Sequence, residues 1–215
     1  MIIKACLFDL DGVVVDTAHF HYLAWKSLAD RLGFEFTKME NERLKGVSRM
    51  DSLRILLEEI GNVSLSGLEK IRLANEKNLL YLKYIQRMTV DDILPGVLEF
   101  LMELKHTGIL LGLGSASKNA RTILERIELV SRFDVIVDGN LITHAKPHPE
   151  VFALGAKLLR TDAVNCIVFE DAIAGIQAAH NAGMKCVGVG SADTLKEADL
   201  VIPGFKNLKL ADIIL

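Results

Sequence analysis

Two carboxylates, Asp9 and Asp11, stand where the apolar run of residues 2–8 ends. A short apolar run bounded by a polar turn is typical of a buried strand. Open α/β sheets bind their ligands at the carboxyl ends of strands, so acids at this position indicate a candidate ligand site. A buried strand that simply meets a solvated turn would give the same pattern.

Three later segments place chemically useful residues next to strand-like runs or helix starts. Ser115 follows one apolar run, Lys146 precedes the turn Pro147-His148-Pro149, and the acidic pair Glu170-Asp171 follows another run. Each has a simpler explanation alone, because a serine can cap a helix and a lysine can face solvent. Together they indicate a site for Mg²⁺ and a phosphoryl group, since Mg²⁺ prefers oxygen ligands and a lysine offsets phosphate charge.

A carboxylate nucleophile would divide phosphoryl transfer into two displacements through an aspartyl-phosphate. A second carboxylate two residues later can act as general acid and base. Asp9 and Asp11 fit these two roles. We expect loss of Lys146 to cripple turnover, because like charges that crowd a site repel each other by several kcal/mol when they are poorly screened.

The runs that resemble strands predict a sheet. From residue 109 onward they alternate with helical patterns, which favours a doubly wound, mostly parallel α/β sheet of the Rossmann type with right-handed crossovers. The predicted strands are Ile2 to Phe8, Ile109 to Leu113, Phe133 to Val137, Cys166 to Phe169, Cys186 to Val189 and Leu200 to Ile202.

Residues 16–90 do not fit this alternation and form a nearly continuous helical pattern. We interpret them as an all-helical cap domain inserted after the first strand, with residues 1–15 and 91–215 forming the catalytic core. One cap helix should end at Gly33 and another should begin at the N-cap Ser48 and end at Gly61. Free backbone amides at a helix start favour an anion, so Lys45, Gly46 and Arg49 could complete a phosphate site, although Arg49 could equally be a surface cation.

The composition of the chain limits the partners and the cellular compartment that we expect. The chain has 215 residues, 50% of them hydrophobic, and a formal net charge of −3 without a long basic block, so neither nucleic acid nor a membrane surface is an expected partner. Cys6, Cys166 and Cys186 lie in apolar runs without metal-ligand spacing, which indicates core residues. The sequence shows no secretory signal or membrane-spanning run, so we expect a cytoplasmic protein, and we further expect a monomer.

The order of Asp9-x-Asp11-Gly12, Ser115, Lys146 and Glu170-Asp171 resembles the haloacid dehalogenase (HAD) superfamily over the whole chain. In having an acid at Asp11 the chain resembles the phosphatase and mutase members of the superfamily, whereas the dehalogenases lack that acid. Within the superfamily the chain looks closest to the β-phosphoglucomutases, on the evidence of the segments Phe8 to Thr17, Leu44-Lys-Gly-Val-Ser-Arg49 and Ser115-Ala-Ser-Lys-Asn119.

This resemblance implies a Mg²⁺-dependent conversion of β-D-glucose 1-phosphate to glucose 6-phosphate through β-D-glucose 1,6-bisphosphate. It makes Asp9 the nucleophile and Asp11 the general acid and base. It assigns the metal to the Asp9 side chain, the Asp11 main-chain oxygen, Glu170 and Asp171, and the transferred phosphate to Ser115, Ala116, Asn119 and Lys146.

The same resemblance implies roles in the cap. Binding of the sugar and its second phosphate would fall to Lys45, Gly46, Val47, Ser48, Arg49, Ser117 and Lys118, and cap closure to Thr17, His21, Trp25, Ser52 and Lys77. His21 and Trp25 could also be ordinary packing residues of a helix. The sequence departs from the family pattern at Ala172, where relatives often have Ser, and at Thr143-His144-Ala145, which replaces a Ser-containing segment.

Two alternatives stay open. The first is a sugar-phosphate or phosphoglycolate phosphatase of the same fold, with water as the phosphoryl acceptor, because fold alone does not fix function. The second is a phosphosugar-binding regulator without catalysis, which the intact set of Asp9, Asp11, Lys146 and Asp171 disfavours. In each case the partner is a small sugar phosphate.

Overall fold

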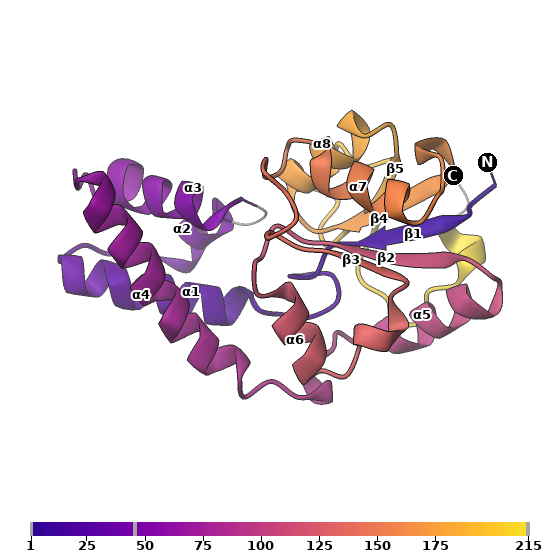
Figure 1. Cartoon of the computed structure of the whole chain (residues 1–215), viewed down its shortest axis with the longest axis horizontal. Coiled ribbons are helices and arrows are strands. Elements are labelled where there is room, and N and C mark those ends of the chain that lie inside the picture. Colours follow the sequence, from indigo (N-terminus) through magenta and orange to yellow (C-terminus); the bar gives the residue numbers. More distant parts are fainter. Residues whose placement is uncertain (1, 45–46, 214–215) are drawn as a thin grey trace.

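A computed structural model describes residues 2–44 and 47–213. It has an α/β core on one side and a group of helices on the other, joined near residues 15 and 90 (Figure 1). Within the described residues no helix has both the length and the apolar character needed to cross a membrane.

The core is built on one six-stranded parallel sheet of order β3-β2-β1-β4-β5-β6. All six predicted strands are present, with bounds shifted by up to three residues. The strands are β1 (Ala5–Phe8), β2 (Leu110–Gly114), β3 (Val135–Val137), β4 (Cys166–Glu170), β5 (Lys185–Val189) and β6 (Leu200–Ile202).

Strand β1 occupies the middle of the sheet and is buried on both faces. Its side chains alternate between the two faces, as strand geometry requires. Ala5 and Leu7 join the apolar cluster with α7 (Glu150–Leu158) and α8 (Ile173–Asn181), whereas Cys6 and Phe8 join the cluster with α5 (Val97–His106) and α6 (Ala120–Arg126). Figure 1 shows these two helix pairs on opposite faces of the sheet. Helices therefore cover both faces of the sheet at β1. All three cysteines are buried, as predicted.

The chain leaves β1 for β2 and β3 on one side and returns to β4 on the other. The carboxyl ends of β1 and β4, which are adjacent in the sheet, thus form the topological switch point at which open α/β sheets bind ligands. Residues that directly follow these two strands lie side by side.

The cap consists of α1 (Ala18–Leu32), α2 (Lys38–Glu42), α3 (Arg49–Arg54), a π-helical segment (Ile55–Ile60) and α4 (Gly67–Ile85). It has an apolar cluster of its own, to which Trp25, Leu28, Leu53 and Leu73 contribute. The helical character predicted for this region is confirmed. The exact division of the chain at residues 16 and 90 stays a prediction.

The predicted cap signals act locally. Gly33 ends α1 with a φ of 84°, a conformation that favours glycine. Ser48 begins α3 by accepting a hydrogen bond from the Asp51 backbone N–H at 3.2 Å. The predicted helix does continue to Gly61, but its last turn is π-helical, and the Gly61 N–H donates to the Leu56 carbonyl. At Gly61 the Phe34 ring occupies the place of a side chain, because an added Cβ would lie 2.5 Å from it.

Short 3₁₀ turns lie between the main helices and strands and near the C-terminus. Four-residue or shorter 3₁₀ turns occur at Val90–Asp92, Val130–Arg132, Ala163–Asn165 and Leu210–Ile213.

Candidate active site

Lys146 is the centre of a buried ionic network between β1 and β4. Its Nζ lies 2.6 Å from Asp9 Oδ1 and 2.7 Å from Glu170 Oε1, and the side chains of Lys146 and Glu170 are fully buried. Burial alone would lower the pKa of Lys146, but the charges of Asp9 and Glu170 outweigh it and raise that pKa above its ordinary value. Lys146 is therefore a permanent cation that fixes the position of both carboxylates.

Glu170 is held from two further directions. Its Oε2 accepts a hydrogen bond of 2.7 Å from the Ala172 backbone N–H. Gly175, in the first turn of α8, leaves room for the carboxylate, because an added Cβ would lie 1.8 Å from Oε1. The close packing of α8 against the sheet thus holds one side chain of the site in place.

Three carboxylates meet at this edge. Asp9, Glu170 and Asp171 each have a carboxylate oxygen within 4.8 Å of those of the other two, and Lys146 pairs with Asp9 and Glu170. A cluster of hard oxygen ligands is suited to Mg²⁺. Gly12 has a φ of 81°, and an added Cβ would lie 2.1 Å from Asp171 Oδ2, so only glycine leaves the Asp171 carboxylate its place. The residues present fit a divalent cation bound mainly by Asp9 and Asp171.

Asp11 differs from Asp9 in its surroundings. The Thr17 hydroxyl donates a hydrogen bond to Asp11 Oδ1. Burial, followed by the charge of Asp9, raises the pKa of Asp11 to about 6. At a pH near neutrality this carboxyl group can therefore both hold and release a proton.

A polar loop follows β2. Ser115 is buried, and its Oγ accepts from the Ser117 N–H at 3.1 Å, while Ser117 Oγ accepts from the Asn119 N–H at 3.2 Å. The hydroxyl groups at this strand end are thus ordered by the backbone of their own loop, beside the carboxylates. This is the strand-to-helix turn expected to receive a phosphate.

The cap contributes cations to the opposite wall. Lys77 Nζ lies 2.9 Å from His21 Nδ1 and 4.4 Å from the centre of the Trp25 ring system. Burial and the nearby charge of Arg49 lower the pKa of Lys77 to about 7, and burial also lowers the pKa of His21, so His21 is neutral. Among the described residues the cap wall therefore carries a positive charge at Arg49, with Lys77 near its titration point.

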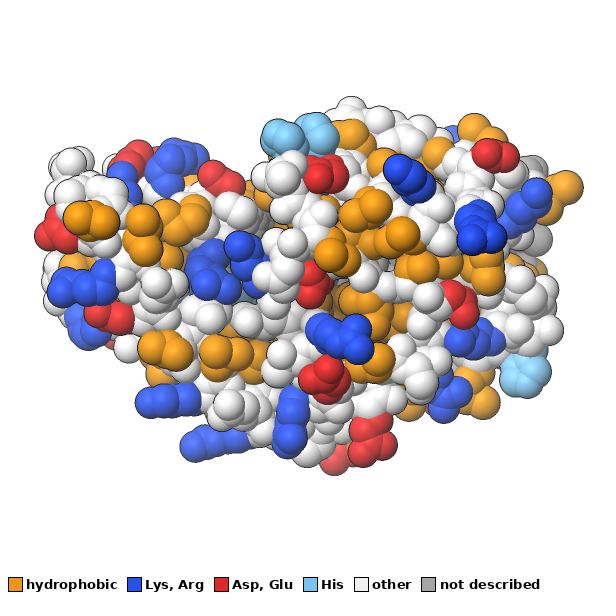
Figure 2. Space-filling model, viewed as in Figure 1, with side chains coloured by type: hydrophobic (Ala, Val, Ile, Leu, Met, Phe, Trp, Pro, Cys, Tyr) orange, Lys and Arg blue, Asp and Glu red, His pale blue; other side chains and the backbone are white. Residues whose placement is uncertain are grey.

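Core and cap enclose a cavity of about 490 Å³. Figure 2 shows a hollow between the two parts of the molecule, with Lys and Arg side chains gathered at it. The candidate site residues that line the cavity are Asp9, Asp11, His21, Trp25, Val47, Ser48, Arg49, Ser52, Lys77, Ser115, Ala116, Ser117, Lys118, Asn119, Lys146 and Asp171.

The remaining candidates lie elsewhere. Thr17 and Glu170 are fully buried behind the cavity wall, where each holds a side chain that lines it. Lys45 and Gly46 fall outside the described residues.

Several cavity residues were absent from the sequence prediction. Asn78 Oδ1 on α4 accepts a hydrogen bond of 2.9 Å from Asn119 Nδ2 and so joins cap to core. Asn41 is buried, and its Oδ1 has no hydrogen-bond partner within the described part of the chain. Asn75 and Asn78 both line the cavity from α4, and this pair of polar residues three positions apart is the signal that could have revealed Asn78.

Comparisons with known proteins agree with this geometry. The family model described as haloacid dehalogenase-like hydrolase matches residues 6–189. A curated β-phosphoglucomutase of Bacillus subtilis is 41% identical over 208 residues, which cover 96% of this chain and 92% of the relative. A phosphorylated carbohydrates phosphatase of Thermotoga maritima is 31% identical over 85% of this chain and 82% of its own length. A crystal structure of β-phosphoglucomutase from Clostridium difficile superposes with a TM-score of 0.94 at 46% identity and covers 99% of this chain and 96% of its own.

Proposed function

The chain belongs to the haloacid dehalogenase-like hydrolase family, and from that premise we propose that it is a phosphomutase that converts β-D-glucose 1-phosphate to glucose 6-phosphate. The observation that carries the proposal is the cavity itself: the phosphoryl-transfer residues Asp9 and Lys146 form one wall, and the cap residues Ser48 and Arg49 form the other. A sugar with a phosphate at each end matches a cavity with phosphate-binding groups at opposite walls.

Asp9 is the nucleophile in this proposal. One oxygen of its carboxylate attacks the phosphorus atom, the bond from phosphorus to the sugar oxygen breaks, and an aspartyl-phosphate forms. Lys146 holds Asp9 in one orientation through the 2.6 Å contact and offsets part of the charge that crowds the site. This positioning explains why the lysine is buried rather than mobile at the surface.

Asp11 moves the proton. In the half-reaction that forms the bisphosphate, its carboxylate removes the proton of the sugar hydroxyl while that oxygen attacks the phosphorus on phosphorylated Asp9 and the bond from phosphorus to Asp9 breaks. In the half-reaction that forms the aspartyl-phosphate again, protonated Asp11 gives the proton to the departing sugar oxygen. A pKa of about 6 is suited to both directions near neutral pH. Thr17 fixes which way the Asp11 carboxyl group points.

Mg²⁺ would be held by Asp9 and Asp171, with Glu170 beside them. The family pattern adds the Asp11 main-chain oxygen as a further ligand. When bound, Mg²⁺ supplies positive charge to the oxygens of the transferred phosphoryl group. Ser115, Ala116 and Asn119 are proposed to bind that phosphoryl group through their loop.

The cap selects the acceptor. The sugar and its second phosphate are proposed to bind to Val47, Ser48 and Arg49 of the cap and to Ser117 and Lys118 opposite. The proposal also includes Lys45 and Gly46, which precede Val47 in the sequence. A cap closed over the sugar excludes water and favours a hydroxyl group as acceptor. The intermediate would then be β-D-glucose 1,6-bisphosphate, which turns over in the cavity to present its other phosphate to Asp9.

The test is a coupled assay for glucose 6-phosphate formed from the α and β anomers of glucose 1-phosphate, with Mg²⁺ and a trace of the bisphosphate, while free phosphate is measured in parallel. Asp9→Asn is the inactive control. The proposal expects glucose 6-phosphate from the β anomer alone and little free phosphate. Stoichiometric phosphate release without isomerisation would instead establish the alternative, a phosphatase, which is the activity in the name of the less similar Thermotoga maritima relative.

A further inference from the structure

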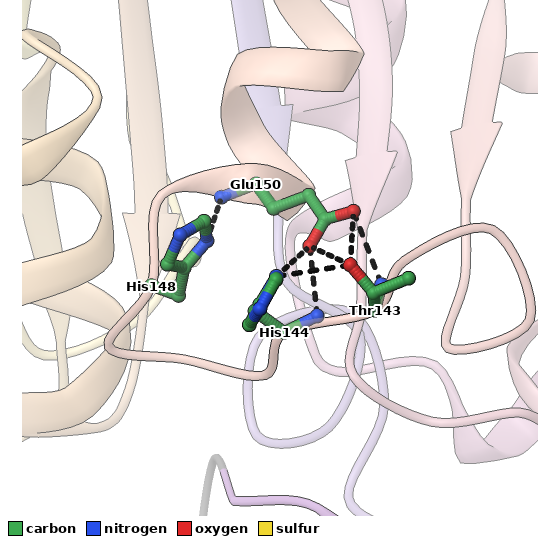
Figure 3. Close-up of polar contacts among 4 residues, drawn as sticks. All are labelled: Thr143, His144, His148 and Glu150. Carbon is green, nitrogen blue, oxygen red and sulfur yellow. Dashed lines mark hydrogen bonds and ion pairs between the residues drawn. The ribbon is translucent and has the colours of Figure 1, made fainter.

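A second group of metal-ligating side chains lies on the outer side of the segment that carries Lys146. His144 and His148 flank Lys146 at two residues on either side, and Glu150 is the first residue of α7 (Figure 3). Lys146 points inward to Asp9, whereas the two histidines are exposed. Neither histidine lines the cavity, so the proposed phosphomutase reaction does not use them.

The three side chains already lie within the reach of one ion. Each offers a nitrogen or oxygen atom within 4.8 Å of those of the other two. His144 Nδ1 lies 3.1 Å from Glu150 Oε2, and the imidazole rings of His144 and His148 are stacked with their centres 4.5 Å apart. Two ligands placed about 2.0–2.1 Å from a tetrahedral ion are about 3.3 Å apart, so the pair of His144 and Glu150 is nearly at the required spacing.

The surrounding backbone prepares Glu150 to act as a ligand. Its carboxylate accepts hydrogen bonds from the backbone N–H groups of Thr143 at 3.1 Å and His144 at 2.7 Å (Figure 3). These bonds lower the pKa of Glu150 to about 2, so the group is ionised at any working pH. Hydrogen bonds of this kind orient a ligating carboxylate in known metal sites.

The donor set identifies the class of ion. Two imidazole nitrogens and one carboxylate oxygen suit Zn²⁺ and its neighbours in the transition series, with water in the fourth position. Mg²⁺ is expected at the buried oxygen ligands Asp9 and Asp171 instead, because it prefers oxygen to nitrogen. The two sites therefore differ in chemistry as well as in burial.

We propose that His144, His148 and Glu150 bind one divalent transition-metal ion, such as Zn²⁺, and that this ion ties together the two ends of the segment that carries Lys146. The bound ion links residues on both sides of Lys146 to the start of α7. It thereby restricts the segment that positions the buried lysine, without touching the catalytic carboxylates.

The experiment is a calorimetric titration of the untagged full chain with Zn²⁺ in excess Mg²⁺, which occupies the oxygen site. The variants are His144→Gln, His148→Gln and Glu150→Gln, and the matched control is His106→Gln, an exposed histidine on α5. The proposal expects one Zn²⁺ per chain in the wild type and in the control, and a loss of affinity of about tenfold or more in each of the three variants. Circular dichroism spectra check that the variants fold.

Melting temperature gives a second readout. Zn²⁺ at ten times its dissociation constant should raise the Tm of the wild type and of His106→Gln by roughly 3–5 °C, and should raise that of His148→Gln by about 1 °C or less. Absence of Zn²⁺ binding in excess Mg²⁺, or binding of equal affinity in His148→Gln and the wild type, would overturn the proposal. Either result would show a cluster held by hydrogen bonds alone. Because the readouts are binding and stability, they are independent of whether the chain is a mutase or a phosphatase.

Discussion

The two walls of the cavity differ in how completely their polar groups are paired. On the core wall, Lys146, Asp9 and Glu170 satisfy one another through short contacts. On the cap wall, Asn41 Oδ1 has no partner in the described residues, and Lys77 sits buried near Arg49 with a pKa lowered to about 7. Buried polar groups are usually paired, so the core wall is organised in the absence of substrate, and we expect the cap wall to gain partners when substrate binds.

This difference matches the division of labour in the proposed reaction. Groups that stabilise a transition state work best when they are fixed in advance. Groups that select a substrate can be completed by the substrate itself, because the binding energy then drives closure.

Replacement of Lys146 should break the core wall most severely. Lys146→Met leaves Asp9 and Glu170 without their shared cation in a buried site, which should cost about 3 kcal/mol of stability and reduce activity at least roughly 100-fold. Urea denaturation and steady-state kinetics measure the two effects. Lys157→Met, at an exposed position on α7, should change neither, and equal stability of the two variants would mean that the network does not depend on its lysine.

Displacement of Glu170 by added volume should have the next largest effect. In Gly175→Ala the new methyl group would lie 1.8 Å from Glu170 Oε1, and we expect a loss of about 1–3 kcal/mol together with reduced kcat. The control is Gly67→Ala, where an added Cβ meets nothing within 4 Å. Thermal unfolding of both variants checks the prediction, and an unaltered Tm in Gly175→Ala would show that α8 does not seat the carboxylate.

Lys77 on the cap wall should make the stability of the protein depend on pH. The pKa of Lys77 is about 7 in the folded protein and 10.5 in its ordinary state, so between these values the unfolded chain binds more protons and stability rises with pH. Lys77→Met removes this contribution. We therefore expect its stability relative to the wild type to be highest near pH 7 and to decline as the pH is raised to about 9.5. Denaturation midpoints at several pH values measure the difference, and a pH-independent difference would contradict the buried, titrating lysine.

The smallest effect concerns the bond between the walls. Asn78→Ala removes the acceptor for Asn119 Nδ2 and should destabilise the chain by about 1 kcal/mol. Asn75→Ala, at an exposed position one turn earlier on α4, is the matched control and should have almost no effect. Chemical denaturation distinguishes them, provided that both proteins retain their helix content.

The sequence was a better guide to the core wall than to the cap wall. Strand ends in a parallel sheet necessarily meet at one edge, so the placement of Asp9, Ser115 and Glu170 followed from the strand pattern alone. The apolar run before Asp9 likewise predicted a buried strand, and β1 is buried on both faces. The observed strand bounds differ from the predicted ones by a few residues, because the ends of an apolar run do not specify where the ladder of hydrogen bonds stops.

The cap wall depends on tertiary packing that no local pattern records. The sequence could place Ser48 and Arg49 at a helix start, but not the contact between His21 and Lys77, which joins residues 56 positions apart. Asn78 was missed because its partner Asn119 lies in the other part of the molecule. Of the group His144, His148 and Glu150, the sequence showed His144 as part of a departure from the family pattern and His148 as part of a turn. The sequence did not connect them with Glu150, because the three meet only when the loop folds back on the start of α7.

The most direct measurement of the account is the fate of the phosphoryl group on Asp9. Protein phosphorylated from labelled β-D-glucose 1,6-bisphosphate is mixed with excess glucose 6-phosphate, and the label is divided between sugar bisphosphate and free phosphate. A cap that selects the acceptor predicts that the wild type transfers most of the label to sugar, and that Arg49→Met transfers several-fold less and releases more as phosphate. An equal division of the label in the two proteins would contradict the claim that the cap wall chooses the acceptor.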